Sequence, residues 1–382
     1  VGVVHIDGNG VGAIMRDLGC AHRAVRKVGV NTTSDEETTE DSKGLQSFIM
    51  EVNRRLDDVV KDAIALSWYY VQELTPDTVV PIAPVLVGGD DVTVYTDGRY
   101  AIPFAEAYIL HYEKLTKDDD LLSVLAIVAG GKKPDAPERD HFEIGDYIIQ
   151  SPGPLTASAG VAIVGRNFPF HIAYDLAEEL VSRGKKLGKK PGTVPCSTIN
   201  FHVLRDATVL DPDDTLDEYK GRAQRPFLIG HYAQDRIMAE ADASPKEKDW
   251  WVQILRTVVA FDGKKPDNPT QTTGDPFPRA RANRIVKLLA EGDAEKATTE
   301  WDVALQNATG AGRLAKQLEH LPPHLSDSTG TGDSLKQIKW LLDLIDLSEN
   351  LPDRYLTLRI GGDTNGTNPE DAADESTERG AK

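Results

Sequence analysis

The sequence predicts an α+β protein in which a mixed domain of strands and helices is followed by a helical domain. Two observations support this fold class. Up to about residue 210, short apolar runs rich in β-branched residues alternate with segments of helical periodicity. Beyond that point the apolar residues recur only at helical spacing. We therefore expect a first domain over residues 1–214, an α-helical domain over residues 215–360, and a disordered acidic tail over residues 361–382.

The predicted elements of the first domain follow the order β-α-β-β-α-β-α-β. The strands are short apolar runs bounded by turn residues, and they span about 1–6, 82–88, 91–96, 155–164 and 197–204. The helices that separate them span about 44–73, 101–116 and 170–187. The first six elements match a ferredoxin-like split βαβ unit (βαββαβ), which is the palm arrangement of many polymerases and nucleotide cyclases.

Individual residues support the helices and the loops between them. In the first helix Phe48, Val52 and Leu56 recur at helical spacing, and Pro76 ends the helix. Pro169 stands near the start of the helix at 170–187. In the helical domain the periodic segments span about 231–241, 248–261, 279–291, 294–307 and 333–349. We expect a surface insertion or loops in the polar or Pro- and Gly-rich segments 31–43, 130–141 and 262–278.

Composition excludes several classes of protein. The chain has 61 acidic and 43 basic residues, and a net charge of −18 makes it a poor general binder of nucleic-acid duplexes. No apolar run approaches the roughly 18–20 residues that span a bilayer, and the first strand lacks the basic flank of a signal peptide. The only cysteines, Cys20 and Cys196, indicate a reducing, cytoplasmic setting and exclude a zinc site made of cysteines alone. Because the chain opens on a strand without an initiator Met, we expect it to be part of a longer protein.

The tetrapeptide Gly-Gly-Asp-Asp at residues 88–91 lies between two of the predicted strands. Gly88 and Gly89 suit a tight hairpin turn, so Asp90 and Asp91 stand at its tip. Adjacent carboxylates on a rigid hairpin are hard-oxygen ligands of the kind that Mg²⁺ or Mn²⁺ prefers. The structural alternative is a turn decorated with solvated aspartates, because Gly and Asp both favour turns.

A partner carboxylate is expected from the end of the first strand. Asp7 follows an apolar run, and the glycine after it lets the backbone approach a metal-bound phosphate closely. The sequence therefore predicts a metal site formed by Asp7, the Gly8 carbonyl, Asp90 and Asp91. Two such ions support nucleotidyl transfer, because one lowers the pKa of an attacking ribose hydroxyl and the other neutralises the leaving pyrophosphate.

Other polar residues have two interpretations each. Lys185, at the end of a predicted helix, can either reach a triphosphate or complement the helix dipole. Ser158 can contact a base or ribose, although packing of a small residue under a helix is the favoured interpretation. Arg222 and Arg225 can contact phosphate or pin the domain junction. We do not expect metal ligands among the isolated histidines His5, His111, His171 and His202.

Several segments together resemble a known family. They are the Gly-Gly-Asp-Asp hairpin, the strand-ending Asp-Gly-x-x-x-Gly, LTASAGVAIV, FPFHIAYDLAEELVSRGKKL and STINFHVL. The chain is similar in these segments to the second palm domain of the large subunit of type III CRISPR effector complexes, and more distantly to GGDEF diguanylate cyclases. The similarity covers about residues 1–235, because RPFLIGHYA resembles the stretch after that palm.

The resemblance implies an activity. Family members polymerise ATP into cyclic oligoadenylate messengers and release pyrophosphate, usually after target RNA binds the complex. It implies Mg²⁺ as cofactor, ATP as substrate, and CRISPR effector subunits with guide and target RNA as partners. Asp7 falls on the strand-end metal ligand, residues 88–91 fall on the signature, and Lys185 falls on a phosphate-binding lysine.

The chain also departs from the family. Asn9 stands where the family often has a second acid, and we match no nuclease-type HD domain, four-cysteine zinc element or first palm. Because the family site lies between two palms, we expect either a homodimer through the palm or a missing half in absent sequence. Two alternatives stay open: a cyclic dinucleotide synthase, and a catalytically silent scaffold subunit of a type III CRISPR RNA-binding complex.

Overall fold

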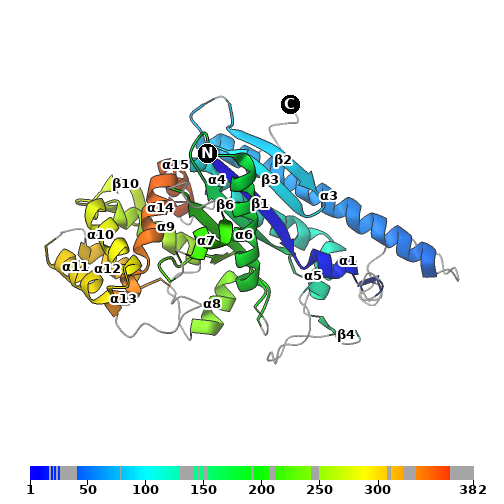
Figure 1. Cartoon of the computed structure of the whole chain (residues 1–382). Coiled ribbons are helices and arrows are strands. Elements are labelled where there is room, and N and C mark those ends of the chain that lie inside the picture. The colour runs from blue at the N-terminus through cyan, green and yellow to red at the C-terminus, as the bar shows by residue number, and fades with distance from the viewer. Residues whose placement is uncertain are drawn as a thin grey trace.

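The computed structural model describes residues 1–16, 41–77, 79–129, 142–144, 147–149, 153–190, 193–205, 211–217, 221–241, 249–307, 311–321 and 333–361, together with residues 19, 21, 22, 25 and 219. Over these residues the chain is an α+β protein. A six-stranded mixed sheet is packed with helices, and the C-terminal region is largely helical (Figure 1). The predicted acidic insertion, the loop at 130–141 and the tail lie almost entirely outside the described residues.

The main sheet contains every strand that the sequence predicts, and one more. Its strands are β1 (Gly2–Asn9), β2 (Ile82–Gly88), β3 (Asp91–Thr96), β6 (Thr156–Ile163), β7 (Ser197–Val203) and β8 (Phe227–Ile229). Their order across the sheet is β2-β3-β1-β6-β7-β8. The pairs are antiparallel except for β6 and β7, which are parallel and are joined through α6 (Phe170–Gly188).

Helices cover the two faces of the sheet. On one face lie α3 (Asp41–Leu74) and α4 (Gly98–Asp118), and on the other lies α6 (Figure 1). Successive side chains of a strand point to opposite faces, so Val4 and Ile6 of β1 enter the core with α3 and α4. Val3 packs instead with Leu176 of α6. By the same alternation Asp7 points to the α6 face.

Shorter elements complete the first part of the chain, and helices form most of the rest. Beside the sheet lie α1 (Val11–Arg16), α5 (Leu122–Ala129), α7 (Pro212–Asp217) and a hairpin of β4 (Phe142–Ile144) and β5 (Tyr147–Ile149). The C-terminal region contains α8 (Ala233–Ala241), α9 (Trp250–Phe261), β9 (Lys264–Lys265), β10 (Asn268–Thr272), α10 (Arg279–Ala290), α11 (Ala294–Asn307), α12 (Ala311–Leu318), α13 (Asp333–Ile338), α14 (Leu341–Asn350) and α15 (Asp353–Gly361).

Three predictions about the region beyond residue 210 are wrong in detail. Strands do not disappear there, because β8 is the outer strand of the main sheet, paired with β7. The segment predicted as a loop at 262–278 contains the β9–β10 hairpin. The single helix predicted over 333–349 is divided into α13 and α14.

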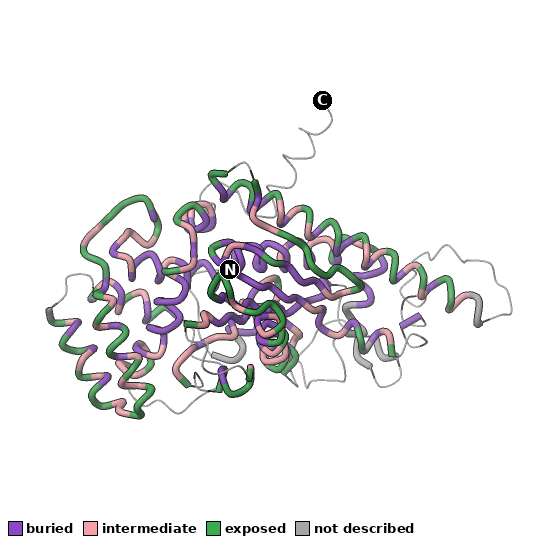
Figure 2. The backbone as a smooth tube through the Cα atoms, turned by 45° about the horizontal axis from the view of Figure 1, so that its top comes forward, coloured by how far each residue is buried: buried purple, intermediate pink, exposed green. Residues whose placement is uncertain are grey.

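Burial follows the layers of the fold (Figure 2). The long helix α3 buries Phe48, Val52, Leu56, Val60 and Ala63 along one stripe and exposes the opposite side. The edge strand β2 is largely exposed along its length. None of the helices in the described part of the chain combines the length and the apolar character needed to cross a membrane.

Candidate metal centre

The hairpin of β2 and β3 turns at Gly89 and Asp90. Gly88 pairs with Asp91 across the hairpin, so only two residues lie between the strands. Gly89 has a φ of 61°, a left-handed conformation that glycine adopts without steric cost. The Gly-Gly-Asp-Asp sequence thus forms the tight turn predicted for it, with Asp90 in the turn and Asp91 at the start of β3.

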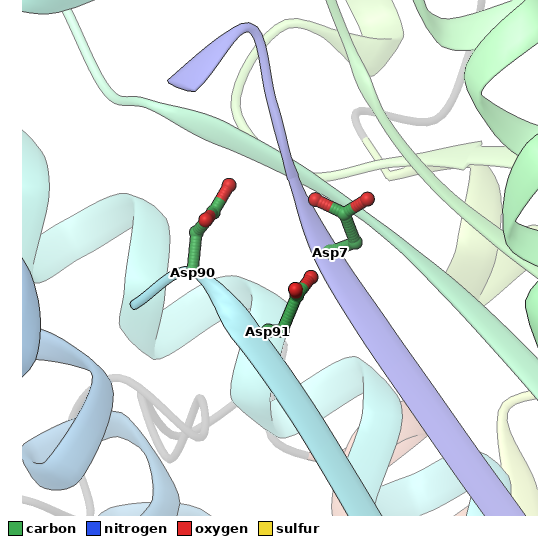
Figure 3. A group of neighbouring side chains, drawn as sticks. All are labelled: Asp7, Asp90 and Asp91. Carbon is green, nitrogen blue, oxygen red and sulfur yellow. The ribbon is translucent and has the colours of Figure 1, made fainter. Parts of the chain in front are cut away.

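Strand pairing brings Asp7 beside the hairpin. Asp7 of β1 lies directly opposite Asp91 of β3, and residues directly opposite in an antiparallel pair point to the same face. Figure 3 shows the carboxylates of Asp7, Asp90 and Asp91 directed toward a common space. One carboxylate oxygen of each residue lies within 4.8 Å of one from each of the others. The structure therefore brings together the three acids that the sequence selected, and we call them the triad.

Gly8 allows this convergence. A Cβ atom at Gly8 would lie 2.8 Å from the Asp90 Oδ2 atom and 3.0 Å from its Cβ atom. Any side chain at this position would push Asp90 away from β1. The glycine after the strand-ending aspartate therefore has a steric role in the site, and its carbonyl oxygen also faces the triad's neighbour Lys185.

Burial and the negative charge of Asp7 raise the proton affinity of Asp90 and Asp91. The pKa of Asp90 is raised to about 6, first by burial and then by the negative charge of Asp7. The pKa of Asp91 is raised by the same two causes. A bound cation would relieve this repulsion, so the electrostatics favour a divalent ion at the triad.

Lys185 projects from α6 into this centre. Its ammonium group donates a hydrogen bond of 3.1 Å to the Gly8 carbonyl oxygen and forms an ion pair with the Asp7 carboxylate. The side chain is only 18% exposed. The predicted phosphate-binding lysine is therefore at the site, where it contacts two of the predicted metal-ligand groups.

Lys189 and Arg16 add positive charge next to Lys185. The pKa of Lys189 is lowered by burial and then by the charge of Lys185, and Arg16 lowers it further. Lys189 lies four residues after Lys185 and is the C-cap residue of α6. The centre thus combines an acidic triad with a neighbouring group of cations.

Asn9 is part of the buried framework of the sheet. Its Nδ2 group donates to Thr156 Oγ1 at 3.1 Å and to the Cys196 carbonyl at 3.2 Å. Its Oδ1 atom accepts a hydrogen bond of 3.0 Å from Ser158, which is itself fully buried and bonded to Thr198. Asn9 therefore positions the strand end, and Ser158 has the packing role that the sequence favoured.

The sequence did not lead us to place His5, Tyr174 and Glu178 beside the triad. His5 is buried, bonds Thr93 at 3.0 Å and contacts the ring of Tyr174 edge-on at 5.3 Å. Burial lowers the pKa of His5, and the charges of Asp91 and Asp7 oppose that effect. The charge of Glu178, on α6, raises the pKa of both His5 and Asp91. A signal was present, because Tyr174, Glu178 and Lys185 recur at helical spacing.

The arginines near the junction are placed away from the triad's ligands. Arg225 pairs with Asp343 and Asp346 of α14, and its side chain is 5% exposed. Arg222 stacks over the ring of Tyr219. Of the two interpretations given above, the structure supports the junction for Arg225.

The donor set fits a hard divalent cation. The three carboxylates and the Gly8 carbonyl offer oxygen atoms only, which suits Mg²⁺ or Mn²⁺ better than zinc or copper. In the part of the chain that the structure describes, no other group of His, Cys, Asp and Glu side chains converges in this way. No protein-family model matches the chain, and no curated protein does.

Proposed function

We propose that this protein is a Mg²⁺-dependent nucleotidyltransferase that converts ATP into cyclic oligoadenylates in CRISPR-type antiviral defence. The convergence of Asp7, Asp90 and Asp91 carries the proposal. Nucleotidyl transfer requires divalent ions held by carboxylates beside a triphosphate, and this centre combines three carboxylates with the ammonium group of Lys185.

The topology supports a palm domain. Strands β1, β2, β3 and β6 lie in the order β2-β3-β1-β6 and are antiparallel throughout. Their connections pass through α3 and α4, which pack on the same face. This order and these connections agree with a ferredoxin-like βαββαβ palm, the fold that the sequence resemblance implies.

The side chains have separate roles in the proposed reaction. Asp7, Asp90, Asp91 and the Gly8 carbonyl would hold the ions, which lower the pKa of a ribose hydroxyl and neutralise the leaving pyrophosphate. The ribose oxygen of one ATP forms a bond to the α-phosphorus of another, the bond to pyrophosphate breaks, and the hydroxyl proton passes to solvent. Lys185 would bind the phosphates as a point charge.

A comparison of two adjacent aspartate pairs tests the proposal. Asp90→Ala with Asp91→Ala is expected to lower pyrophosphate release from ATP with Mg²⁺ or Mn²⁺ at least 10³-fold, measured by pyrophosphate assay and mass spectrometry of products. Asp57→Ala with Asp58→Ala, an exposed pair on α3, is the matched control and should keep full activity. Product formation that survives the first double change would contradict the assignment.

Separate experiments test the substrate and the partners. No described contact at the centre selects a base, so each of the four nucleoside triphosphates is supplied separately. A cyclic dinucleotide formed from GTP would support the GGDEF-like alternative.

The proposed partners are other CRISPR effector subunits with guide and target RNA, and a second copy docked through the palm. Sedimentation of the chain alone tests whether two copies form a dimer.

One observation favours a silent scaffold as the second candidate. Asn9 replaces an acid that the related family often carries, and its amide is fully engaged within the sheet. Such a centre has one carboxylate fewer with which to hold a second ion. Failure of the chain to bind ATP with Mg²⁺ in calorimetry would support the scaffold and contradict the enzyme.

A further inference from the structure

The ammonium group of Lys185 occupies the coordination space of two predicted ligands. It contacts both the Asp7 carboxylate and the Gly8 carbonyl oxygen. A divalent ion held by these oxygens would lie within a few ångströms of the ammonium nitrogen. Two positive charges at such a separation repel each other, and the repulsion is larger when one of them is a divalent ion. Lys185 and the ion therefore compete for Asp7 and Gly8.

The cations around Lys185 favour an anion as a second partner for its ammonium group. Lys189, the C-cap residue of α6, lies close enough for the charges of Lys185, Asp7 and Arg16 to act on it, so further positive charge lies near Lys185. A lysine displaced from Asp7 would join these cations, and their repulsion would be relieved by an anion. A polyphosphate is an anion that binds both to a divalent ion and to lysine ammonium groups.

We propose that Lys185 is a positioning residue that exchanges between the Asp7–Gly8 oxygens and the phosphates of the nucleotide, and thereby makes metal and nucleotide bind cooperatively. This inference rests on the proposed function and adds a mechanism of regulation to the same centre. Without nucleotide, Lys185 weakens metal binding at the triad. With nucleotide, Lys185 moves to phosphate and frees Asp7 and Gly8 for the ion. Because coupling between two binding sites is reciprocal, the metal strengthens nucleotide binding by the same factor.

The experiment measures two affinities for each variant. The first is for Mn²⁺ alone, by electron paramagnetic resonance of the free ion. The second is for Mn²⁺ with an ATP analogue that has a methylene group between the α- and β-phosphates, by calorimetry. Lys185→Met is expected to bind Mn²⁺ alone roughly ten-fold more tightly than the wild type, and to bind the Mn²⁺–analogue complex roughly ten-fold more weakly.

Two further variants separate this role from others. Lys186→Met, the neighbouring and exposed lysine of α6, should leave both affinities unchanged. Lys185→Arg retains the positive charge and should restore most of the wild-type behaviour. A merely structural lysine would lower both affinities when replaced by Met, and a phosphate ligand without competition would leave the affinity for Mn²⁺ alone unchanged. Either of these results overturns the inference.

These measurements also distinguish a failure of the proposed function from a failure of the role inferred for Lys185. If the wild-type protein and Lys185→Met both fail to bind Mn²⁺, the proposed function and this inference are both wrong. If the wild type binds Mn²⁺ and the analogue complex, but Lys185→Met does not bind Mn²⁺ alone more tightly, only the inference is wrong. Thermal unfolding of each variant shows whether a lost affinity reflects a lost fold.

Discussion

The candidate metal centre and the junction between the sheet and α14 both contain several carboxylates, but they balance the charge differently. We define the junction cluster as Arg205, Arg225, Asp343, Asp346 and Glu349. In it Asp346 accepts hydrogen bonds of 2.7 Å from both Arg205 and Arg225. In the triad the one described ammonium contact to a carboxylate is that of Lys185 with Asp7.

The pKa values express the same difference. Burial raises the pKa of Asp343 to about 7, and the charge of Arg225 opposes the rise. Burial raises the pKa of Asp90 to about 6, and the charge of Asp7 adds to the rise. The junction cluster therefore contains its own counter-charges, as a structural cluster does. The three acids of the triad have one lysine in contact with them, so they keep a surplus of negative charge that an added cation would reduce.

Breaking the junction cluster is expected to have the largest effect on stability. Arg225→Met leaves Asp343 and Asp346 buried with too little positive charge, and removal of one partner from a buried ion pair costs about 3–5 kcal/mol. Urea unfolding measures this loss, and Mn²⁺ affinity of the folded protein should not change. Arg222→Met is the matched control, because among the residues that the structure describes Arg222 contacts an aromatic ring and no acid, and it should cost below about 1 kcal/mol. A loss below 1 kcal/mol for Arg225→Met would show that the two clusters do not differ in this way.

Removing a charge from the triad is expected to change stability in the opposite direction, so that the metal-free protein becomes more stable. Asp90→Asn eliminates repulsion with Asp7 and Asp91, so the metal-free protein should gain about 1–2 kcal/mol at pH 7.5, after allowance for solvent screening. The same change should abolish stabilisation by Mn²⁺. Urea unfolding in chelator and in excess Mn²⁺ measures both effects. A destabilised Asp90→Asn protein in chelator would contradict the surplus of negative charge.

The pH dependence of this gain follows from the raised pKa of Asp90. The proton binds more tightly in the folded state, so its stabilising contribution is fully present below about pH 4 and is lost as pH rises through about 6. The advantage of Asp90→Asn over the wild type should therefore be largest above about pH 7 and should disappear near pH 4. An advantage that is independent of pH would point to a change in packing.

Much of the sheet was predictable because its signals are local. The strands of the hairpin have the predicted bounds of 82–88 and 91–96, since apolar runs rich in valine flank a two-residue Gly-Asp turn. In contrast, β8 has only three residues and gains its strand conformation by pairing with β7. The β9–β10 hairpin has few apolar residues, so periodicity does not reveal it.

The site was predictable in its residue types but not in its contacts. The turn places Asp90 and Asp91 together, so their proximity is a local property of the sequence. The pairing of Asp7 with Asp91 depends on the register between β1 and β3, which no local signal sets. The contact of Lys185 with Asp7 and Gly8 depends on how α6 packs against β1. Contacts of this kind join residues far apart in the chain, so the local patterns of a single sequence do not predict them.

The smallest expected effect is at Gly8, and it tests the geometry of the triad rather than its charge. A methyl group at Gly8 would lie 2.8 Å from Asp90 Oδ2, and a Cβ contact under 3.0 Å forces the neighbour to move. Gly8→Ala should therefore displace the Asp90 carboxylate and weaken Mn²⁺ binding several-fold, roughly 1 kcal/mol or less.

Gly88→Ala is the matched control for that change, because Gly88 is a neighbouring glycine with nothing within 4 Å of a Cβ atom at its position. Neither residue has a positive φ, so alanine strains the backbone at neither position. Mn²⁺ titration of the two variants compares them directly. Equal Mn²⁺ affinities of the two variants would mean that Asp90 can move away from Gly8 without weakening metal binding. The Asp7 and Asp91 carboxylates, opposite each other across β1 and β3, would then hold the ion between them, and the turn aspartate would be dispensable.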